Sequence, residues 1–167
     1  MGYREHKAKS RRSVKVAIVV VSDSRTRDTD ESGLAAKRLL EEGGHTVSEQ
    51  ILVRNDESAI ERTVEGLLAN PNVDAVITIG GTGISRKDIT VETLSRMTEK
   101  QLSGFGELFR MMSYEEIGTG ALMSRSTAGI ARGKVVICLP GSKSAVELAV
   151  SRIIVPEIGH MVTEATK

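Results

Sequence analysis

The hydrophobic positions of this chain form short apolar runs separated by longer amphipathic segments. The apolar runs lie at residues 14–21, 46–53, 75–79 and 134–139. Runs of this length that are rich in β-branched residues predict buried strands. Between them, apolar residues recur at helical spacing. This alternation predicts an α/β fold with three α/β/α layers and a mostly parallel central sheet.

The amino-terminal segment and the overall composition limit the class of protein. Residues 1–13 are basic and polar, which predicts a solvated or loosely docked arm, with an anion-binding tail as the alternative. Residues 14–167 are long enough for a single domain with its own core. The 23 basic and 22 acidic residues nearly cancel, and aromatic residues are scarce. We therefore expect no nucleic-acid or membrane partner. The lack of a signal-peptide core predicts a cytoplasmic protein.

The third apolar run ends in a turn with almost no side chains, Gly80-Gly81-Thr82-Gly83. Such a turn lets backbone N–H groups approach a ligand closely. In parallel sheets, anionic ligands bind beyond the carboxyl ends of the strands, where this turn falls. A purely structural turn is the alternative interpretation. The turn is neither a Walker A loop nor a dinucleotide fingerprint, because the residues that complete those motifs are missing.

Two other predicted strands also end in small or hydroxylated residues. Ser22-Asp23-Ser24 follows the first strand, and Pro140-Gly141-Ser142 follows the last. The carboxyl ends of parallel strands lie on one rim of a sheet, so these turns are expected to converge with the glycine turn. Their convergence favours an anionic ligand at that rim.

Several local signals predict helix boundaries. Ser58/Glu61 and Ser144/Glu147 have the spacing of capping boxes, and Asp56, taken alone, is typical of a capping residue. Thr90 can cap a short helix. Residues 118–133 are rich in glycine and serine and are expected to be irregular. Pro156 predicts a kink or break near Val155.

Histidine and cysteine give no sign of catalytic chemistry. His6, His45 and His160 fall in no motif and are interpreted as surface or structural residues. Cys138 is the single cysteine, so an intrachain disulfide is excluded. Because it lies in an apolar run, we expect a buried and unreactive thiol.

Six short motifs occur in order along the chain: VVVSDS, DESG, IGGTGISRKDIT, FGELFRMMS, SRSTAGI and LPGS. Together they resemble the MogA/MoaB-type proteins of molybdenum-cofactor synthesis, and the chain is also similar to the gephyrin G domain. The resemblance covers about residues 14–163. It implies a MogA-like molybdopterin-binding fold and a homotrimer, or a hexamer built as a dimer of trimers. It also implies binding of molybdopterin, a pterin dithiolene with a terminal phosphate. Active members transfer AMP from Mg-ATP to that phosphate and release pyrophosphate.

The resemblance also assigns roles to individual positions. It implies that Asp56 and Asp88 are catalytic, with Asp56 holding Mg²⁺ and Asp88 orienting the pterin or sharing the metal. The implied ligand-binding positions are Ser22, Asp30, Ser32, Gly80, Gly81, Thr82, Gly83, Ser113, Pro140, Gly141 and Ser142.

The chain departs from the family pattern at three positions close to Asp88. Arg86 and Val91 stand where the family has proline, and Lys87 stands where it has arginine. Lys87 keeps the charge but lacks the planar fork that grips phosphate at two points. These departures leave open a non-catalytic molybdopterin-binding carrier or scaffold. A hydride-transferring nucleotide enzyme is disfavoured by the missing third glycine.

Overall fold

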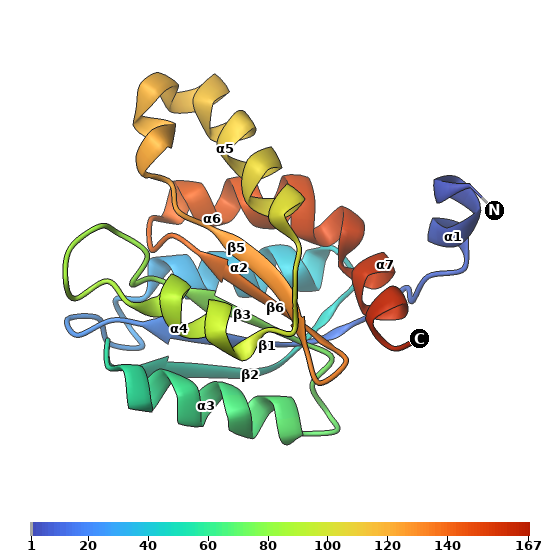
Figure 1. Cartoon of the computed structure of the whole chain (residues 1–167), viewed down its shortest axis with the longest axis horizontal. Helices are drawn as coiled ribbons and strands as arrows, with labels where there is room; N and C mark the ends of the chain where they lie inside the picture. The colour runs from blue at the N-terminus through green and yellow to red at the C-terminus, as the bar shows by residue number, and fades with distance from the viewer. Residues whose placement is uncertain (1) are drawn as a thin grey trace.

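The computed structural model describes residues 2–167, which fold around a six-stranded sheet of order β2-β1-β3-β6-β5-β4 (Figure 1). The strands are β1 (Lys15–Val21), β2 (Thr46–Val53), β3 (Ala75–Ile79), β4 (Lys100–Gln101), β5 (Thr127–Ala131) and β6 (Lys134–Leu139). β2, β1, β3 and β6 are parallel, whereas β5 and β4 pair in antiparallel fashion at one edge. The prediction of a mostly parallel sheet is confirmed.

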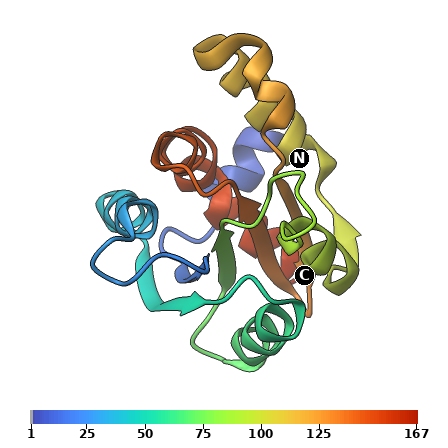
Figure 2. The same cartoon turned by 90° about the vertical axis from the view of Figure 1, so that its left-hand side faces the viewer.

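Helices cover both faces of this sheet (Figure 2). They are α1 (Tyr3–Ala8), α2 (Glu31–Glu42), α3 (Glu57–Ala69), α4 (Thr90–Met97), α5 (Ser103–Ile117), the 3₁₀ segment η1 (Gly118–Met123), α6 (Lys143–Ala149), the π segment η2 (Val150–Ile154) and α7 (Val155–Ala165). Buried side chains of α2, α5, α6 and α7 form one core, and those of α3 and α4 form the other. The three layers are therefore α/β/α.

Strand β1 shows why the central strands are apolar throughout. Val16, Ile18 and Val20 point into the first core, whereas Val19 and Val21 point into the second. Successive side chains of a strand face opposite sides of the sheet, so a strand covered on both sides must be apolar at every position.

The capping role predicted for Asp56 is confirmed, whereas the caps predicted at Ser58, Ser144 and Thr90 are wrong. α3 begins earlier than expected because the Asp56 carboxylate accepts a hydrogen bond from the Ala59 N–H at 2.9 Å. Ser142 caps α6 in the same way. Ser58 and Ser144 consequently lie inside their helices. Thr90 lies in the first turn of α4, but its hydroxyl makes no cap hydrogen bond.

Residues 118–133 are more regular than their composition suggests, because they contain η1 and β5. Because β5 consists mainly of small residues, its sequence lacks the alternation of apolar and polar side chains that marks a strand. Gly129 is required there because a Cβ would lie 2.6 Å from the Lys100 carbonyl oxygen on β4. The break expected near Val155 is observed as the π segment η2, which directly precedes the turn containing Pro156.

The amino-terminal arm, residues 2–13, is docked by specific contacts. It forms α1 beside α7 (Figure 1). The Arg11 guanidinium pairs with Asp74 at 2.8 Å, and the Arg11 N–H donates to Thr163 Oγ1 at 3.0 Å. The sequence could not reveal these partners, which lie far along the chain. Within residues 2–167 no helix is both long enough and apolar enough to span a membrane.

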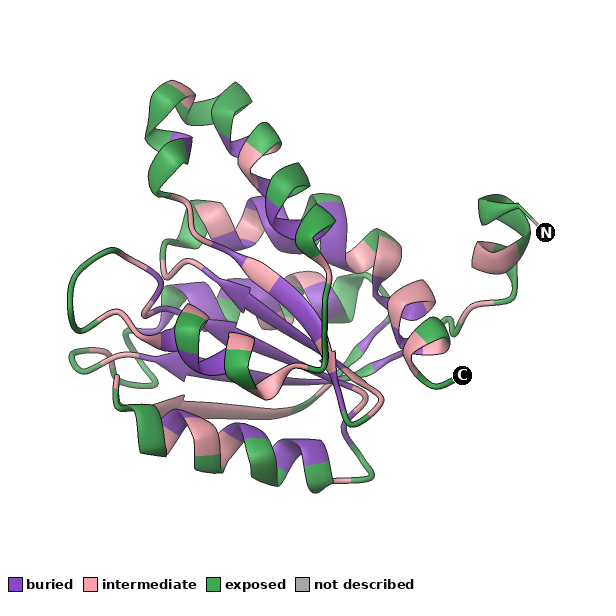
Figure 3. Ribbon diagram, viewed as in Figure 1, coloured by how far each residue is buried: buried purple, intermediate pink, exposed green. Residues whose placement is uncertain are grey.

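The hairpin formed by α5 and η1 projects from the body and is largely exposed (Figure 3). Its exposed apolar side chains, here called the apolar ridge, are Leu108, Met111, Tyr114, Ile117, Leu122 and Met123. Leu122 is 83% exposed, although leucine is usually a buried residue. Exposed apolar side chains gathered on one projecting element are typical of an interaction site.

Candidate functional site

The turns after β1, β2, β3 and β6 lie together at the carboxyl ends of the parallel strands, on the left of Figure 1. Backbone hydrogen bonds join them in pairs. The Ser22 N–H donates to the Val53 carbonyl at 2.9 Å, and the Gly80 N–H donates to the Leu139 carbonyl at 3.0 Å. The expected convergence of strand-end turns is therefore observed, and we call this group of turns the rim.

The glycine turn after β3 has a backbone that only glycine adopts without strain. Gly80 and Gly81 have φ values of +105° and +68°. A Cβ on Gly80 would overlap the Val21 carbonyl oxygen of the neighbouring strand. A Cβ on Gly81 would overlap Thr90 Oγ1 and would lie 3.0 Å from Asn55 Oδ1. The end of β1, the turn after β2 and α4 therefore all contact the backbone of the glycine turn directly.

Two polar atoms beside Gly81 have no hydrogen-bond partner within the described residues. They are Asn55 Oδ1 and Thr90 Oγ1, and both are buried. A buried polar atom without a partner costs on the order of 1–3 kcal/mol, and such atoms require a specific explanation in a folded protein. Sequence reasoning missed Asn55 as a site residue. The available signal was its position directly before Asp56 at the end of β2.

The two predicted catalytic carboxylates flank this glycine turn. Asp56 follows Asn55, which abuts Gly81. The Asp88 carboxylate lies 2.6 Å from the position that a Cβ on Gly83 would occupy. Asp56 is exposed and Asp88 is half-buried. They therefore belong to the same rim, on either side of one loop.

Asp88 also organises its own loop. Its carboxylate accepts hydrogen bonds from Ser85 Oγ at 2.6 Å and from the Ser85 N–H at 3.2 Å. The Asp88 N–H in turn donates to the Ser85 carbonyl at 3.0 Å. These contacts hold the carboxylate close to Gly83. They leave its other oxygen, Oδ1, available to a ligand or a metal ion.

A partly buried network joins the loop after β1 to the turn after β6. Arg25 donates from Nη1 to Ser32 Oγ at 3.1 Å and from Nη2 to the Gly141 carbonyl at 2.8 Å. Ser32 Oγ donates to the same carbonyl at 2.7 Å. Asp30 Oδ1 lies 3.7 Å from the Arg25 guanidinium and caps α2 through the Gly33 N–H. Sequence reasoning missed Arg25, whose partners lie on another turn.

The predicted ligand positions differ in how closely they adjoin the glycine turn. Gly141 packs against it, because a Cβ on Gly141 would lie 3.4 Å from the Gly80 Cα. Thr82 is buried within the glycine turn, and Pro140 and Ser142 belong to the β6 turn. Ser113 instead lies buried within α5 rather than in a turn. A ligand contact by Ser113 stays a prediction.

A hollow of about 240 Å³ adjoins the rim between the first loop, α2 and β2. Arg27, Asp30 and Gln50 supply its polar lining, and Leu34, Ile51 and Leu52 its apolar lining. Gln50 donates to Asp30 Oδ2 at 3.3 Å. The hollow could receive an extension of a ligand whose charged end lies on the rim.

The rim residues fit a magnesium ion that arrives with a nucleotide better than a metal held by protein alone. Within residues 2–167 no group of three or more His, Cys, Asp or Glu side chains is arranged to hold a metal. Mg²⁺ is usually bound by one or two carboxylates together with substrate phosphates. Asp56 and Asp88, flanking the glycine turn, meet that requirement.

The cysteine lies within the sheet two residues before Pro140, and the three histidines lie at the opposite end of the strands from the rim. Cys138 on β6 is fully buried, and burial raises the pKa of its thiol to about 12. The prediction of a buried thiol is confirmed, and its lack of reactivity stays a prediction. His6 lies on α1, His45 directly precedes β2, and His160 lies on α7. All three are at the amino-terminal end of the parallel strands.

Comparisons with known proteins agree with this geometry. The sequence profile of the family described as "Probable molybdopterin binding domain" matches residues 17–160. The molybdenum cofactor biosynthesis protein B of Bacillus anthracis is 44% identical, with 98% of each chain covered. That of Bacillus subtilis strain 168 is 42% identical and covers 100% of this chain and 99% of its own.

Solved structures show the same fold. A crystal structure of a molybdenum cofactor biosynthesis protein B has a TM-score of 0.89 and 44% identity, covering 92% of this chain and 96% of that one. The tungsten cofactor synthesizing protein MoaB from Pyrococcus furiosus has a TM-score of 0.80 and 35% identity, covering 95% and 100%.

The fold and the rim define a doubly wound α/β domain with a candidate ligand site at the carboxyl ends of its strands. More specifically, the chain belongs to the molybdopterin-binding family of MogA/MoaB-type cofactor biosynthesis proteins.

Proposed function

We propose that this protein acts in molybdenum cofactor biosynthesis and adenylylates molybdopterin, using Mg-ATP and releasing pyrophosphate. The observation that carries the proposal is the Gly80–Gly83 turn. Its bare backbone lies between Asp56 and Asp88 and against two buried oxygens without partners. The names of the relatives, which place those proteins in cofactor biosynthesis, support the pathway.

The reaction requires positioning more than acid–base chemistry. An oxygen of the pterin phosphate attacks the α-phosphorus of ATP, and the bond from that phosphorus to the bridging oxygen breaks as pyrophosphate leaves. The attacking phosphate is already an anion, so no base has to remove a proton. Positioning and charge neutralisation supply most of the catalysis in such transfers. The absence of a histidine at the rim is compatible with this reaction.

Each element of the rim has a role in this proposal. The backbone N–H groups of Gly81 to Gly83 and the Thr82 hydroxyl hold phosphate oxygens. Asp56 would hold the magnesium ion that accompanies ATP, and that ion would supply the positive charge that offsets the phosphates. Asp88, held near Gly83 by Ser85, orients the pterin or shares the metal.

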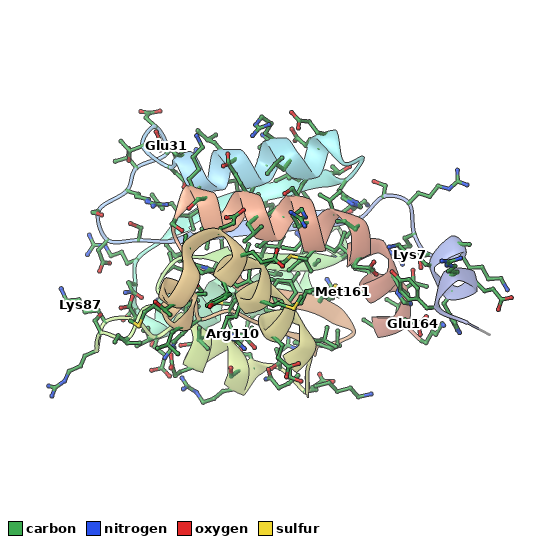
Figure 4. All side chains as sticks on the ribbon, turned by 90° about the horizontal axis from the view of Figure 1, so that it is seen from above. Lys7, Glu31, Lys87, Arg110, Met161 and Glu164 are labelled. Carbon is green, nitrogen blue, oxygen red and sulfur yellow. The ribbon has the colours of Figure 1, made fainter. Side chains whose placement is uncertain are left out.

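A non-catalytic carrier or scaffold is the second candidate. Arg86, Lys87 and Val91 depart from the family pattern in the loop that holds Asp88. Lys87 lies at the outer edge of the molecule, far from Lys7 at the opposite end (Figure 4). A carrier would use the same rim to bind pterin without using ATP.

One experiment distinguishes the transferase from the carrier. Purified protein is mixed with molybdopterin and Mg-ATP, and adenylylated pterin and pyrophosphate are measured together. Stoichiometric formation of both products supports the transferase. Saturable pterin binding without either product assigns the carrier role instead.

We also propose that the protein assembles as a homotrimer, or as a hexamer built from two trimers. The apolar ridge on α5 and η1 supports self-association, because it exposes six large apolar side chains on one projecting hairpin. Burying such surface between subunits is favourable by about 25 cal/mol per Å².

A further inference from the structure

A polar hollow of about 250 Å³ lies at the amino-terminal end of the parallel strands, opposite the rim. Its walls are the amino-terminal arm, the turn before β2 and the start of α7. The charged or titratable residues that line it are Lys7, Arg11, Arg12, His45 and His160, and its lining contains no acidic residue. Figure 4 shows Lys7 on α1 at this end of the molecule.

Specific contacts build this hollow. Arg11 is fixed by Asp74 and Thr163, which hold the arm against α7. Gly159 on α7 completes the fit, because a Cβ there would overlap the Arg11 carbonyl oxygen. The arm therefore forms a defined wall rather than a loose tail.

The arm concentrates positive charge. It contains five basic residues and one acidic residue, whereas the whole chain has a net charge of +1. Lys7 pairs with Glu157 and Arg11 pairs with Asp74. Arg12 lines the hollow and is exposed, and it makes no hydrogen bond or ion pair within residues 2–167.

His45 adds a buried polar side chain with one ring nitrogen that makes no hydrogen bond. The residue is 8% exposed, and its Nδ1 has no hydrogen-bond partner within the described chain. Its Nε2 lies 3.4 Å from the Val155 carbonyl oxygen.

We propose that this hollow is a second anion-binding site, which accepts a small phosphate-bearing anion through Arg12. Guanidinium groups bind phosphate oxygens in a planar, two-point geometry. The volume lies below the ~300–1,000 Å³ typical of pockets for drug-sized ligands, which favours phosphate or pyrophosphate over a whole nucleotide. The site is separate from the rim and does not depend on adenylylation.

Calorimetric titration of the full chain with inorganic phosphate, pyrophosphate and ATP, at constant ionic strength, tests this site. We expect saturable binding that weakens at least tenfold in Arg12→Gln and is only partly kept in Arg12→Lys, which retains the charge but not the planar fork. Arg4→Gln is the matched control, because it removes the same charge from the same arm without touching the hollow. We expect it to change the affinity less than twofold. Because the proposed function places ATP at the rim, only ATP binding that Arg12→Gln weakens is assigned to the hollow. Pyrophosphate that binds at least as tightly as this Arg12-dependent ATP identifies a free anion, whereas tighter Arg12-dependent ATP binding identifies the phosphates of a nucleotide.

Backbone amide shifts in nuclear magnetic resonance locate the bound anion. Shifts centred on residues 7–12 and 43–45 support the proposal. Shifts confined to residues 80–83 would assign the anion to the rim and overturn it. Equal weakening by Arg4→Gln and Arg12→Gln would also overturn it, because diffuse attraction to the arm would then explain the binding.

Discussion

The Arg25 guanidinium donates to the Gly141 carbonyl oxygen at 2.8 Å, joining residues 116 positions apart. This contact ties the long loop after β1 to the turn after β6. Because Gly141 packs on Gly80, the contact also supports the glycine turn after β3. Arg25 thus acts as a positioning residue for the rim.

Replacing Arg25 should loosen the rim. Arg25→Met removes hydrogen bonds to Ser32 and Gly141, so we expect the free energy of unfolding to fall by about 1–3 kcal/mol. Arg27→Met, from the same loop, should change it by less than about 0.5 kcal/mol. Urea denaturation measures both variants. Equal stability of the two variants would show that the Arg25 network does not hold the loop.

The glycine turn should not tolerate a methyl group. Gly80→Ala places a Cβ against the Val21 carbonyl at φ +105°, and we expect a loss of at least about 2 kcal/mol. Gly66→Ala is the matched control, because a Cβ on Gly66 in α3 meets no atom within 4 Å. It should instead stabilise the protein by about 0.5–1 kcal/mol. Thermal unfolding of both variants gives the comparison, and a Gly80→Ala protein as stable as wild type would refute the packing described.

Cys138 should make stability depend on alkaline pH. Burial raises the pKa of its thiol to about 12 in the folded protein, above the ordinary value of 9.0. The folded state therefore holds this proton more tightly, and its contribution to stability is full below pH 9 and is lost as the pH rises toward 12. Stability curves of wild type and Cys138→Ala should diverge across this range. Parallel curves would contradict the raised pKa.

The thiol should also resist labelling while the protein is folded. At pH 8 a thiol reagent should react with Cys138 only as fast as the protein opens, because the thiolate is the reactive form. The urea-unfolded chain should react at once. Rapid labelling of the native protein would contradict the burial of Cys138.

The apolar ridge should control assembly. Ile117 and Leu122 are 59% and 83% exposed, so Ile117→Lys combined with Leu122→Lys should leave the fold intact and prevent self-association. Sedimentation velocity measures the mass of each form. A double variant that keeps the wild-type mass would place any subunit contact elsewhere.

The sequence predicts the centre of this fold better than its edge. β1, β3 and β6 are continuous apolar runs, because both faces of each strand are covered. β4 has only two residues, and β5 consists mainly of small residues, so neither carries a periodic signal. Local spacing also misplaced the caps of α3 and α6, where Asp56 and Ser142 begin the helices earlier.

The site was predictable to the extent that parallel strands share a rim. This rule alone brings Ser22, the glycine turn and Gly141 together. The buried oxygens of Asn55 and Thr90 were not predictable, because whether a polar atom finds a partner depends on tertiary packing. The same holds for the contact between Arg25 and Gly141, which no local pattern marks.

Asp56 has a structural and a proposed chemical role, and one substitution separates them. Asparagine caps helices about as well as aspartate, so Asp56→Asn should preserve α3 while removing the charge that binds magnesium. The most direct measurement is the rate of pyrophosphate release from Mg-ATP in the presence of molybdopterin, with unfolding recorded in parallel. We expect Asp56→Asn to lose at least a hundredfold in rate at wild-type stability. A rate equal to that of the wild type would contradict the proposal that this rim transfers AMP through Asp56.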